Sequence, residues 1–232
     1  MPVNELPKTI KDFINSIKVI DYSTAFNALS KYADVNKNRS VDKNLIVIAG
    51  PNGSGKSTLI KQYIEYFNLF DYEYINSDIY ARTLFSDVQD EKEKYLKAFE
   101  IEKGKKETAL KESRNFIMET VNSSDKNFDF YKRCKESGYK ITVIFIATDS
   151  PEINIKRVAK RVSQGGHGVP QDKIISRYYK SIENAKPLFA VADEILIFDN
   201  SIDNESPELC YYKGKSVIFK SDNMVNWIDK IV

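Results

Sequence analysis

Cysteine and histidine are nearly absent from this chain of 232 residues, which contains two cysteines and one histidine. Cys134 and Cys210 lie far apart and match no metal-binding or redox spacing, so we expect free thiols in a reducing cytoplasm. The lone His167 lies in a glycine-rich segment, where we expect it to form hydrogen bonds rather than act as a base or metal ligand. Disulfides and structural metals are unnecessary at this length, because the chain can bury a full core.

Long apolar runs and a strong excess of one charge are also missing. No run approaches 18 apolar residues, and the N-terminus lacks the basic and apolar regions of a signal peptide. The net charge is only +2, and no stripe of alternating aromatic and basic residues is present. We therefore expect a soluble, cytoplasmic protein with no membrane partner, and nucleic acid is disfavoured as a ligand.

The chain does contain a glycine-rich segment with the spacing G-x-x-x-x-G-K-[ST]. Its residues are Gly50, Pro51, Asn52, Gly53, Ser54, Gly55, Lys56, Ser57 and Thr58. A short apolar run precedes the segment and an amphipathic helical pattern follows it, as in a phosphate-binding loop. Such glycines let backbone N–H groups surround a phosphate, while Lys56 supplies charge to the β- and γ-phosphates and Ser57 a hydroxyl to Mg²⁺. The segment therefore predicts a site for ATP or GTP with Mg²⁺.

Short apolar segments alternate with helical patterns from residue 44 onward. We expect strands at 44–49, 72–76, 114–118, 141–147 and 194–198, and helices near 57–68, 88–112, 125–137, 151–163 and 171–186. This alternation predicts an α/β fold of the P-loop NTPase class, with a five-stranded parallel sheet and helices on both faces. Residues 209–219 depart from it and predict a β-hairpin, after which Asp222 begins a short terminal helix.

We expect residues 1–43 to form a helical extension that is separate from the P-loop domain at 44–232. Two amphipathic patterns, through Ile10–Ile17 and Phe26–Tyr32, predict two helices, and the polar segment 36–40 reads as a linker. From these patterns alone, two roles stay open for this extension: a stabilising flap on the domain at 44–232, and dimerisation.

Polar residues follow the second and third predicted strands, at the edge of the sheet where ligands bind in parallel α/β folds. Asp78 is placed to accept the proton of an attacking hydroxyl, and Arg82 lies one helical turn further on. Glu119 and Thr120 end the third strand and suit a polar acceptor. The alternatives are that Asp78 caps a helix with an ordinary ion pair to Arg82, and that Glu119 caps a strand end.

A glycine-rich segment at 164–170 lies between two helices that carry Arg157, Arg161 and Arg177. This arrangement is typical of a lid that brings cations onto a transferred phosphate. The alternative is that these arginines are ordinary surface groups.

The chain resembles zeta-toxin-like kinases in five segments that occur in the same order. They are GPNGSGKST, SDIYAR, FIMETVNSS, ATDSPEINIKRVAKRVSQGGHGVP and the Phe198–Ser201 segment, spanning about residues 44–201. The resemblance implies a P-loop kinase whose best-known members move the γ-phosphate of ATP onto the 3′-hydroxyl of a UDP-N-acetyl-sugar. It also implies a helical antitoxin that obstructs the nucleotide site, a function that residues 1–43 could provide in cis.

Carried over by position, the resemblance makes Lys56 and Ser57 the ligands of nucleotide and Mg²⁺, and Asp78 the base. It directs Glu119 and Thr120 toward the acceptor and makes Arg161 and Arg177 the groups that neutralise the phosphates. Val121 departs from the pattern, because the cell-wall-targeting members tend to have a second threonine there. The nucleotide chemistry therefore transfers well and the identity of the acceptor poorly.

Three functions remain after this reading. The first is a small-molecule kinase of the zeta type, and the second is a nucleoside or polynucleotide-end kinase. The third is a nucleotide-dependent switch without an acceptor, which would need a residue that positions water and a segment that senses the γ-phosphate. Asp78 and the lid favour a kinase with a small-molecule acceptor.

Overall fold

Strands and helices alternate along the chain in the computed structural model, which describes residues 43–203, 205, 207–222 and 226–231. The two helices expected at residues 1–43 lie outside the described residues, apart from Lys43. The strands are β1 (Lys43–Ala49), β2 (Glu73–Ile75), β3 (Phe116–Thr120), β4 (Tyr139–Ala147), β5 (Glu194–Asp199), β6 (Glu208–Lys213) and β7 (Ser216–Lys220). The α-helices are α3 (Lys56–Tyr66), α4 (Ser77–Leu84), α5 (Glu91–Lys111), α6 (Phe128–Glu136), α7 (Pro151–Ser163) and α8 (Gln171–Glu183). Two 3₁₀ helices are described, η2 (Lys186–Ala190) and η3 (Asn226–Lys230).

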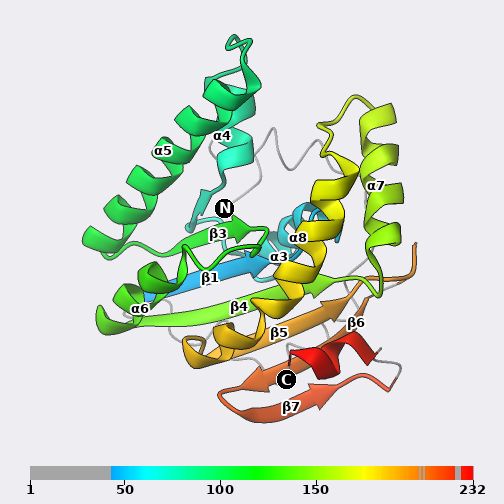
Figure 1. The fold of residues 1–232 in the computed structure, drawn as a ribbon. Helices are drawn as coiled ribbons and strands as arrows, with labels where there is room; N and C mark the ends of the chain where they lie inside the picture. The colour runs from blue at the N-terminus through cyan, green and yellow to red at the C-terminus, as the bar shows by residue number, and fades with distance from the viewer. Residues whose placement is uncertain (1–42, 204, 206, 223–225, 232) are drawn as a thin grey trace.

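The strands form one sheet in the order β2-β3-β1-β4-β5-β6-β7 (Figure 1). The first five of these are parallel, which confirms the predicted five-stranded parallel core. The predicted C-terminal hairpin is present as β6 and β7, but it continues the same sheet through antiparallel pairing of β6 with β5. The sheet therefore has seven strands, because the hairpin covers the backbone edge that β5 would otherwise expose.

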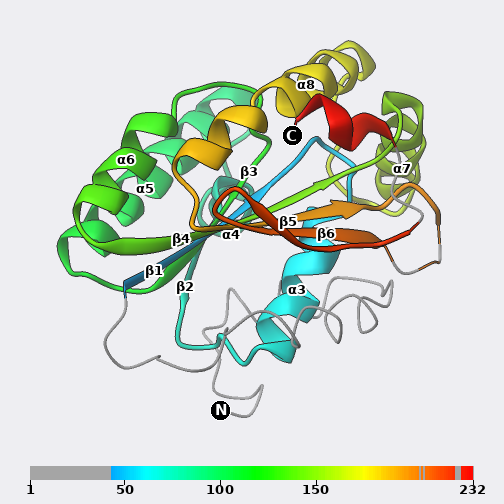
Figure 2. The same cartoon turned by 90° about the horizontal axis from the view of Figure 1, so that it is seen from below.

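Helices cover both faces of the sheet, but unequally (Figure 2). Among the described elements, α5, α6, α8 and η3 lie on one face and α3 lies on the other. Because both faces are covered, the central strands are apolar throughout: the residues from Leu45 to Ala49 in β1 are all at most 4% exposed. Cys134 and Cys210 are buried and free, as expected. None of the described helices combines the length and apolarity needed to cross a membrane.

Two predicted boundaries near the site are wrong, and both have a local cause. The helix expected at 88–112 begins at Glu91, because the side chain of Asp90 caps it by accepting a hydrogen bond of 2.9 Å from the backbone of Glu93. The separate α4 precedes it and packs against α5 beside the sheet (Figure 1). Strand β3 ends two residues later than expected, because its pairing with β1 continues through Glu119 and Thr120.

Candidate active site

The glycine-rich loop joins β1 to α3 at the carboxyl end of the sheet, and its backbone permits only glycine at two positions. Gly50 and Gly53 have φ angles of 144° and 80°. A Cβ atom on Gly50 would lie 2.0 Å from the carbonyl oxygen of Ile146, and one on Gly53 would lie 2.7 Å from that of Asn154. The loop is therefore packed directly on β4 and α7, and its shape is set by these neighbours.

Two asparagine side chains hold the loop from outside. Nδ2 of Asn154 donates a 2.6 Å hydrogen bond to the carbonyl of Asn52, and Nδ2 of Asn200 donates a 2.8 Å bond to that of Ser54. The hydroxyl of Thr148 in turn bonds Oδ1 of Asn154. Sequence reasoning did not single out these asparagines, since 102 and 146 residues separate each donor from its acceptor.

Lys56 is a buried cation without a carboxylate partner. Its side chain is 7% exposed, and Nζ donates hydrogen bonds of 2.8 and 2.9 Å to the carbonyls of Gly50 and Pro51. It forms no ion pair with any residue in the described part of the chain. Burial lowers the pKa of Lys56, while the charges of Glu119 and Asp78 oppose that change. A buried ammonium of this kind gains from an anion, so the loop is prepared for a phosphate.

Ser57 follows Lys56 in the first turn of α3 and is partly exposed. The described residues contain no group of three His, Cys, Asp or Glu side chains that could hold a metal ion by themselves. This donor set fits Mg²⁺, which is commonly held by one or two protein oxygens together with the phosphates of a nucleotide.

Asp78 lies in the first turn of α4, immediately beyond β2, and its side chain is exposed. The helix cap is Asn76, whose Oδ1 accepts a 2.8 Å hydrogen bond from the backbone N–H of Asp78. The alternative in which Asp78 itself caps the helix is therefore wrong. No ion pair joins Asp78 to Arg82 or to any other described residue, so the carboxylate is available to a ligand.

Glu119 is anchored by two side chains from the neighbouring strand β2 and its end. Its Oε2 accepts a 2.6 Å hydrogen bond from the hydroxyl of Tyr74 and a 2.9 Å bond from Nδ2 of Asn76. The same Asn76 amide lies 2.9 Å from the Tyr74 hydroxyl. Burial raises the pKa of Glu119, whereas Lys56 and the Tyr74 hydrogen bond lower it. Asn76 thus holds both acids of the site, because it caps the helix of Asp78 and donates to Glu119.

Strand order explains why these residues meet. Since β2, β3 and β1 are consecutive in the sheet, their carboxyl ends bring Asp78, Glu119 and the phosphate loop to one place. In agreement with this arrangement, the charges of Asp78 and Glu119 both raise the pKa of Lys56 against the effect of burial. The structure therefore brings together the predicted nucleotide residues and both predicted acids.

Arg161 faces the same cluster from α7. Burial lowers its pKa, as does the nearby charge of Arg82, whereas Asp78 and Glu119 raise it. Neither Arg161 nor Arg82 forms an ion pair with a residue that the structure describes, so these two like charges repel each other and would gain from an anion. Nε of Arg161 donates a 3.0 Å bond to the carbonyl of His167, and the His167 ring lies 5.4 Å from that of Tyr95 in α5. The glycine-rich segment is thus connected to α7 and to the α4–α5 pair.

Arg177 lies apart from this cluster, in the wall of an adjoining cleft of about 420 Å³ between α5, α6 and α8. Ser77 and Thr120 line the same cleft, so it opens next to Asp78 and Glu119. The hydroxyl of Thr120 accepts a 3.0 Å bond from the backbone of Asn122 and keeps its own proton for a ligand. Arg157, by contrast, pairs with Asp203 at 2.7 Å and bonds the carbonyl of Asn200, which makes it a structural residue.

The cleft is rich in cations, and some of them are already paired. Lys106 pairs with Glu102 at 2.9 Å, and Arg133 with Glu107 at 2.5 Å. The remaining basic side chains in its lining are Lys103, Lys126 and Arg177, none of which pairs with a described residue. These unpaired charges favour an anionic ligand.

A protein-family model described as zeta toxin matches residues 29–216 of the chain. An uncharacterized protein of Haemophilus influenzae is 28% identical over 138 residues, which cover 57% of this chain and 91% of that protein.

Solved structures show the same fold at low identity. A structure described with the PezAT chromosomal toxin-antitoxin system of Streptococcus pneumoniae has a TM-score of 0.57 at 16% identity, covering 92% of this chain and 88% of that one. A structure of AvrRxo1-ORF1 and AvrRxo1-ORF2 with ATP has a TM-score of 0.57 at 12% identity, covering 93% and 71%.

Proposed function

The chain belongs to the zeta toxin family, and from that premise we propose that it is an ATP-dependent kinase for a small, anionic molecule. It would transfer the γ-phosphate to an acceptor hydroxyl, for which a UDP-N-acetyl-sugar is the leading candidate. The observation that carries the proposal is the meeting of Lys56, Asp78 and Glu119 at the ends of three consecutive strands, beside a cationic cleft.

The phosphate loop supplies the donor side of the reaction. In the structure the Lys56 ammonium bonds the loop's own carbonyls, and a bound phosphate would replace these neutral acceptors with a charged one. Ser57 would contribute its hydroxyl to Mg²⁺, which neutralises the charge that develops on the phosphates. The AvrRxo1 complex with ATP, which shares the fold, supports ATP as the donor.

Asp78 acts as the general base in this proposal. Its side chain is exposed, its neighbour Ser77 lines the cleft, and no described cation pairs with its carboxylate, so it can accept the proton of an acceptor hydroxyl. Glu119 positions the acceptor instead. Both of its side-chain hydrogen bonds end on Oε2, so Oε1 accepts none of them and remains for the ligand.

The arginines act on the transferred group and on the acceptor. Arg161 and Arg82 lie near both acids but form no direct ion pair with a described residue, so their charge can stabilise the developing phosphoryl charge. Arg177 approaches from the cleft, together with Lys103 and Lys126, and would hold the anionic part of the acceptor. This division modifies the sequence-based hypothesis, which gave Arg161 and Arg177 the same role.

The zeta toxin family also suggests how the enzyme is restrained. We propose that a helical antitoxin, or residues 1–43 acting in cis, covers the nucleotide site. The PezAT structure, described as part of a toxin-antitoxin system, supports the first of these. The cytoplasm, where ATP is present, is the compartment we propose.

The experiment is a transfer assay with a defined panel of acceptors. The protein is incubated with ATP or GTP, Mg²⁺ and, separately, a UDP-N-acetyl-sugar, nucleosides and a 5′-hydroxyl oligonucleotide, and phosphorylated products are identified by mass spectrometry. A product from the nucleotide-sugar that disappears in Lys56→Ala supports the proposal. Transfer to the oligonucleotide alone would establish a polynucleotide-end kinase. Nucleotide hydrolysis with no phosphorylated acceptor, in the panel or in a metabolite extract, would overturn the kinase assignment.

A further inference from the structure

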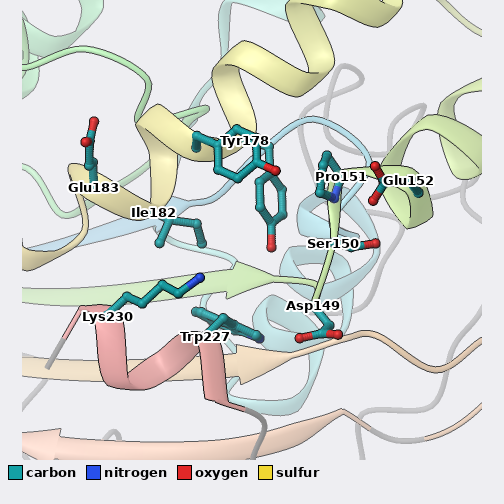
Figure 3. Close-up of a pocket in the computed structure, with 10 residues that line it drawn as sticks. Asp149, Ser150, Pro151, Glu152, Tyr178, Ile182, Glu183, Trp227 and Lys230 are labelled. Atoms are coloured by element: carbon teal, nitrogen blue, oxygen red, sulfur yellow. The ribbon is translucent and has the colours of Figure 1, made fainter.

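A second cavity, of about 320 Å³, lies outside the phosphate loop and the acceptor cleft (Figure 3). Tyr178 and Ile182 of α8 line one side, and Trp227 and Lys230 of η3 line the other. Asp149, two residues beyond the end of β4, also lines the cavity. None of the phosphate-loop residues or predicted catalytic residues lines it, so the reaction proposed above does not use this cavity.

The charged groups of the cavity are mainly acidic. Three carboxylates line it, those of Asp149, Glu152 and Glu183, against the single ammonium of Lys230. None of these four side chains forms an ion pair with a residue that the structure describes. Uncompensated acids around a concave surface attract a cation, because the low-dielectric walls concentrate their field.

The position of Glu183 strengthens this argument. It is the last residue of α8, where the helix carries its partial negative charge, and an acid there is unfavourable for the helix. The helix dipole therefore destabilises a carboxylate at this position. A positively charged ligand would stabilise it.

Three aromatic side chains form part of the remaining walls, together with Ser150, Pro151 and Ile182. Tyr178 and Trp227 are 4% and 3% exposed, whereas Tyr179 is 58% exposed. Ring faces attract organic cations, and the attraction increases when water is excluded. Burial raises the pKa of Tyr178, and the charges of Asp149 and Glu152 raise it further, in agreement with a negative potential inside the cavity.

A chain of hydrogen bonds connects the cavity to the phosphate loop. The hydroxyl of Tyr178 donates a 2.6 Å bond to the carbonyl of Thr148. The Thr148 hydroxyl bonds Oδ1 of Asn154, and Nδ2 of Asn154 donates a 2.6 Å bond to the carbonyl of Asn52 in the loop. A ligand that shifts the Tyr178 ring would therefore act on the loop through three hydrogen bonds.

We propose that this cavity binds a small organic amine in its ammonium form and that its occupation changes the affinity of the phosphate loop for nucleotide. The carboxylates would hold the ammonium group, the aromatic rings would enclose its carbon chain, and Tyr178 would transmit occupation to the loop.

Trp227 provides a direct probe, because it is the only tryptophan of the chain and lines the cavity. Intrinsic fluorescence of the full-length protein is titrated with butane-1,4-diammonium, with butane-1,4-diol as the neutral control of similar size and NaCl as the ionic-strength control. We expect a saturable change with the diamine alone. An equal response to the diol or to NaCl, or no saturable response to the diamine, would overturn the proposal.

Two charge variants predict effects of opposite sign. Glu183→Gln should raise the Kd of the diamine by about two- to fivefold, and Lys230→Gln should lower it by a similar factor, the usual size for one partly exposed charge. Non-specific damage to the fold would weaken binding in both variants. Unchanged affinity in both, with each variant folded by circular dichroism, would contradict the assigned charges.

The connection to the loop is tested by nucleotide binding rather than by turnover, so its result does not depend on the kinase assignment. Saturating diamine should change the Kd of ATP by about fivefold or more, a usual size for coupling between two sites. Tyr178→Phe removes the hydroxyl but keeps the ring, so diamine should still bind while the change in ATP affinity is lost. Persistence of the full change in this variant would exclude the path through Tyr178.

Discussion

The hydroxyl of Tyr74 donates a 2.6 Å hydrogen bond to Oε2 of Glu119, across neighbouring strands of the sheet. Burial raises the pKa of this carboxyl group, and the hydrogen bond from Tyr74 opposes that rise. The pair therefore sets the pH range over which Glu119 is ionised beside the phosphate loop.

Replacing Tyr74 with phenylalanine should move the acidic limb of the pH–rate profile to higher pH. Loss of the hydrogen bond raises the pKa of Glu119 further, so the carboxylate is protonated at a pH where the wild-type group is still charged. If transfer needs ionised Glu119, its rate falls as pH decreases through this raised pKa. The measurement is kcat/KM against pH.

A matched control for this variant is Tyr139→Phe. Its hydroxyl is also buried and bonds the carbonyls of Ala109 and Arg114, away from the site. It should reduce stability without moving the pH profile. Equal profiles for Tyr74→Phe and the wild type would remove Tyr74 from the positioning of Glu119.

Asp78→Asn should lower transfer by about 10² or more while ATP affinity stays within a few-fold, as expected for loss of a general base. Asparagine keeps the shape of the side chain, and the helix cap at Asn76 is unaffected. Single-turnover rates and the Kd of ATP are measured separately. A collapse of nucleotide affinity would show that Asp78 binds the metal or supports the loop instead.

Arg161→Ala should reduce the transfer rate by about 10², and reduce ATP affinity less, because its charge is needed most as the phosphoryl group leaves. Arg157→Ala, from the same helix, is the control. Arg157 pairs with Asp203 and bonds Asn200, so its loss should lower the melting temperature and leave kcat close to wild type. Equal losses of rate and affinity in Arg161→Ala would indicate ordinary ground-state binding.

Arg177→Ala should mainly raise the KM of the acceptor, since Arg177 lines the cleft rather than the cluster around Lys56. Steady-state kinetics with the acceptor varied at saturating ATP provide the test. A large fall in kcat with unchanged KM would show instead that Arg177 neutralises the transferred phosphate, the role that the sequence analysis gave it.

Removal of residues 1–40 should lower the melting temperature. In the described part of the chain α3 is the one helix on its face of the sheet (Figure 2), and apolar side chains of β5 and β6 belong to the core on that face. We expect the extension to act as a flap on this face, so its removal would expose apolar side chains to water. Thermal unfolding and transfer kinetics are measured on the same samples. Faster turnover, tighter ATP binding or toxicity on expression would instead show that the extension obstructs the site in cis.

Local sequence determined the phosphate loop and most of the elements around it. The spacing of Gly50, Gly53 and Lys56 is sufficient to identify the loop. The apolar run before it and the amphipathic pattern after it lie within about twenty residues, so no long-range contact is needed. The positions of Asp78 and Glu119 were also predictable, since both directly follow or end a recognisable strand.

Only the tertiary structure decided which side chains hold these groups. Tyr74 and Glu119 are 45 residues apart, and Asn200 and Ser54 are 146 apart, so their contacts depend on strand order and register. Composition and periodicity do not specify that order. The same reason separates Arg157 from Arg161. They are one helical turn apart on α7, and only the packing of that helix directs one to Asp203 and the other toward Asp78 and Glu119.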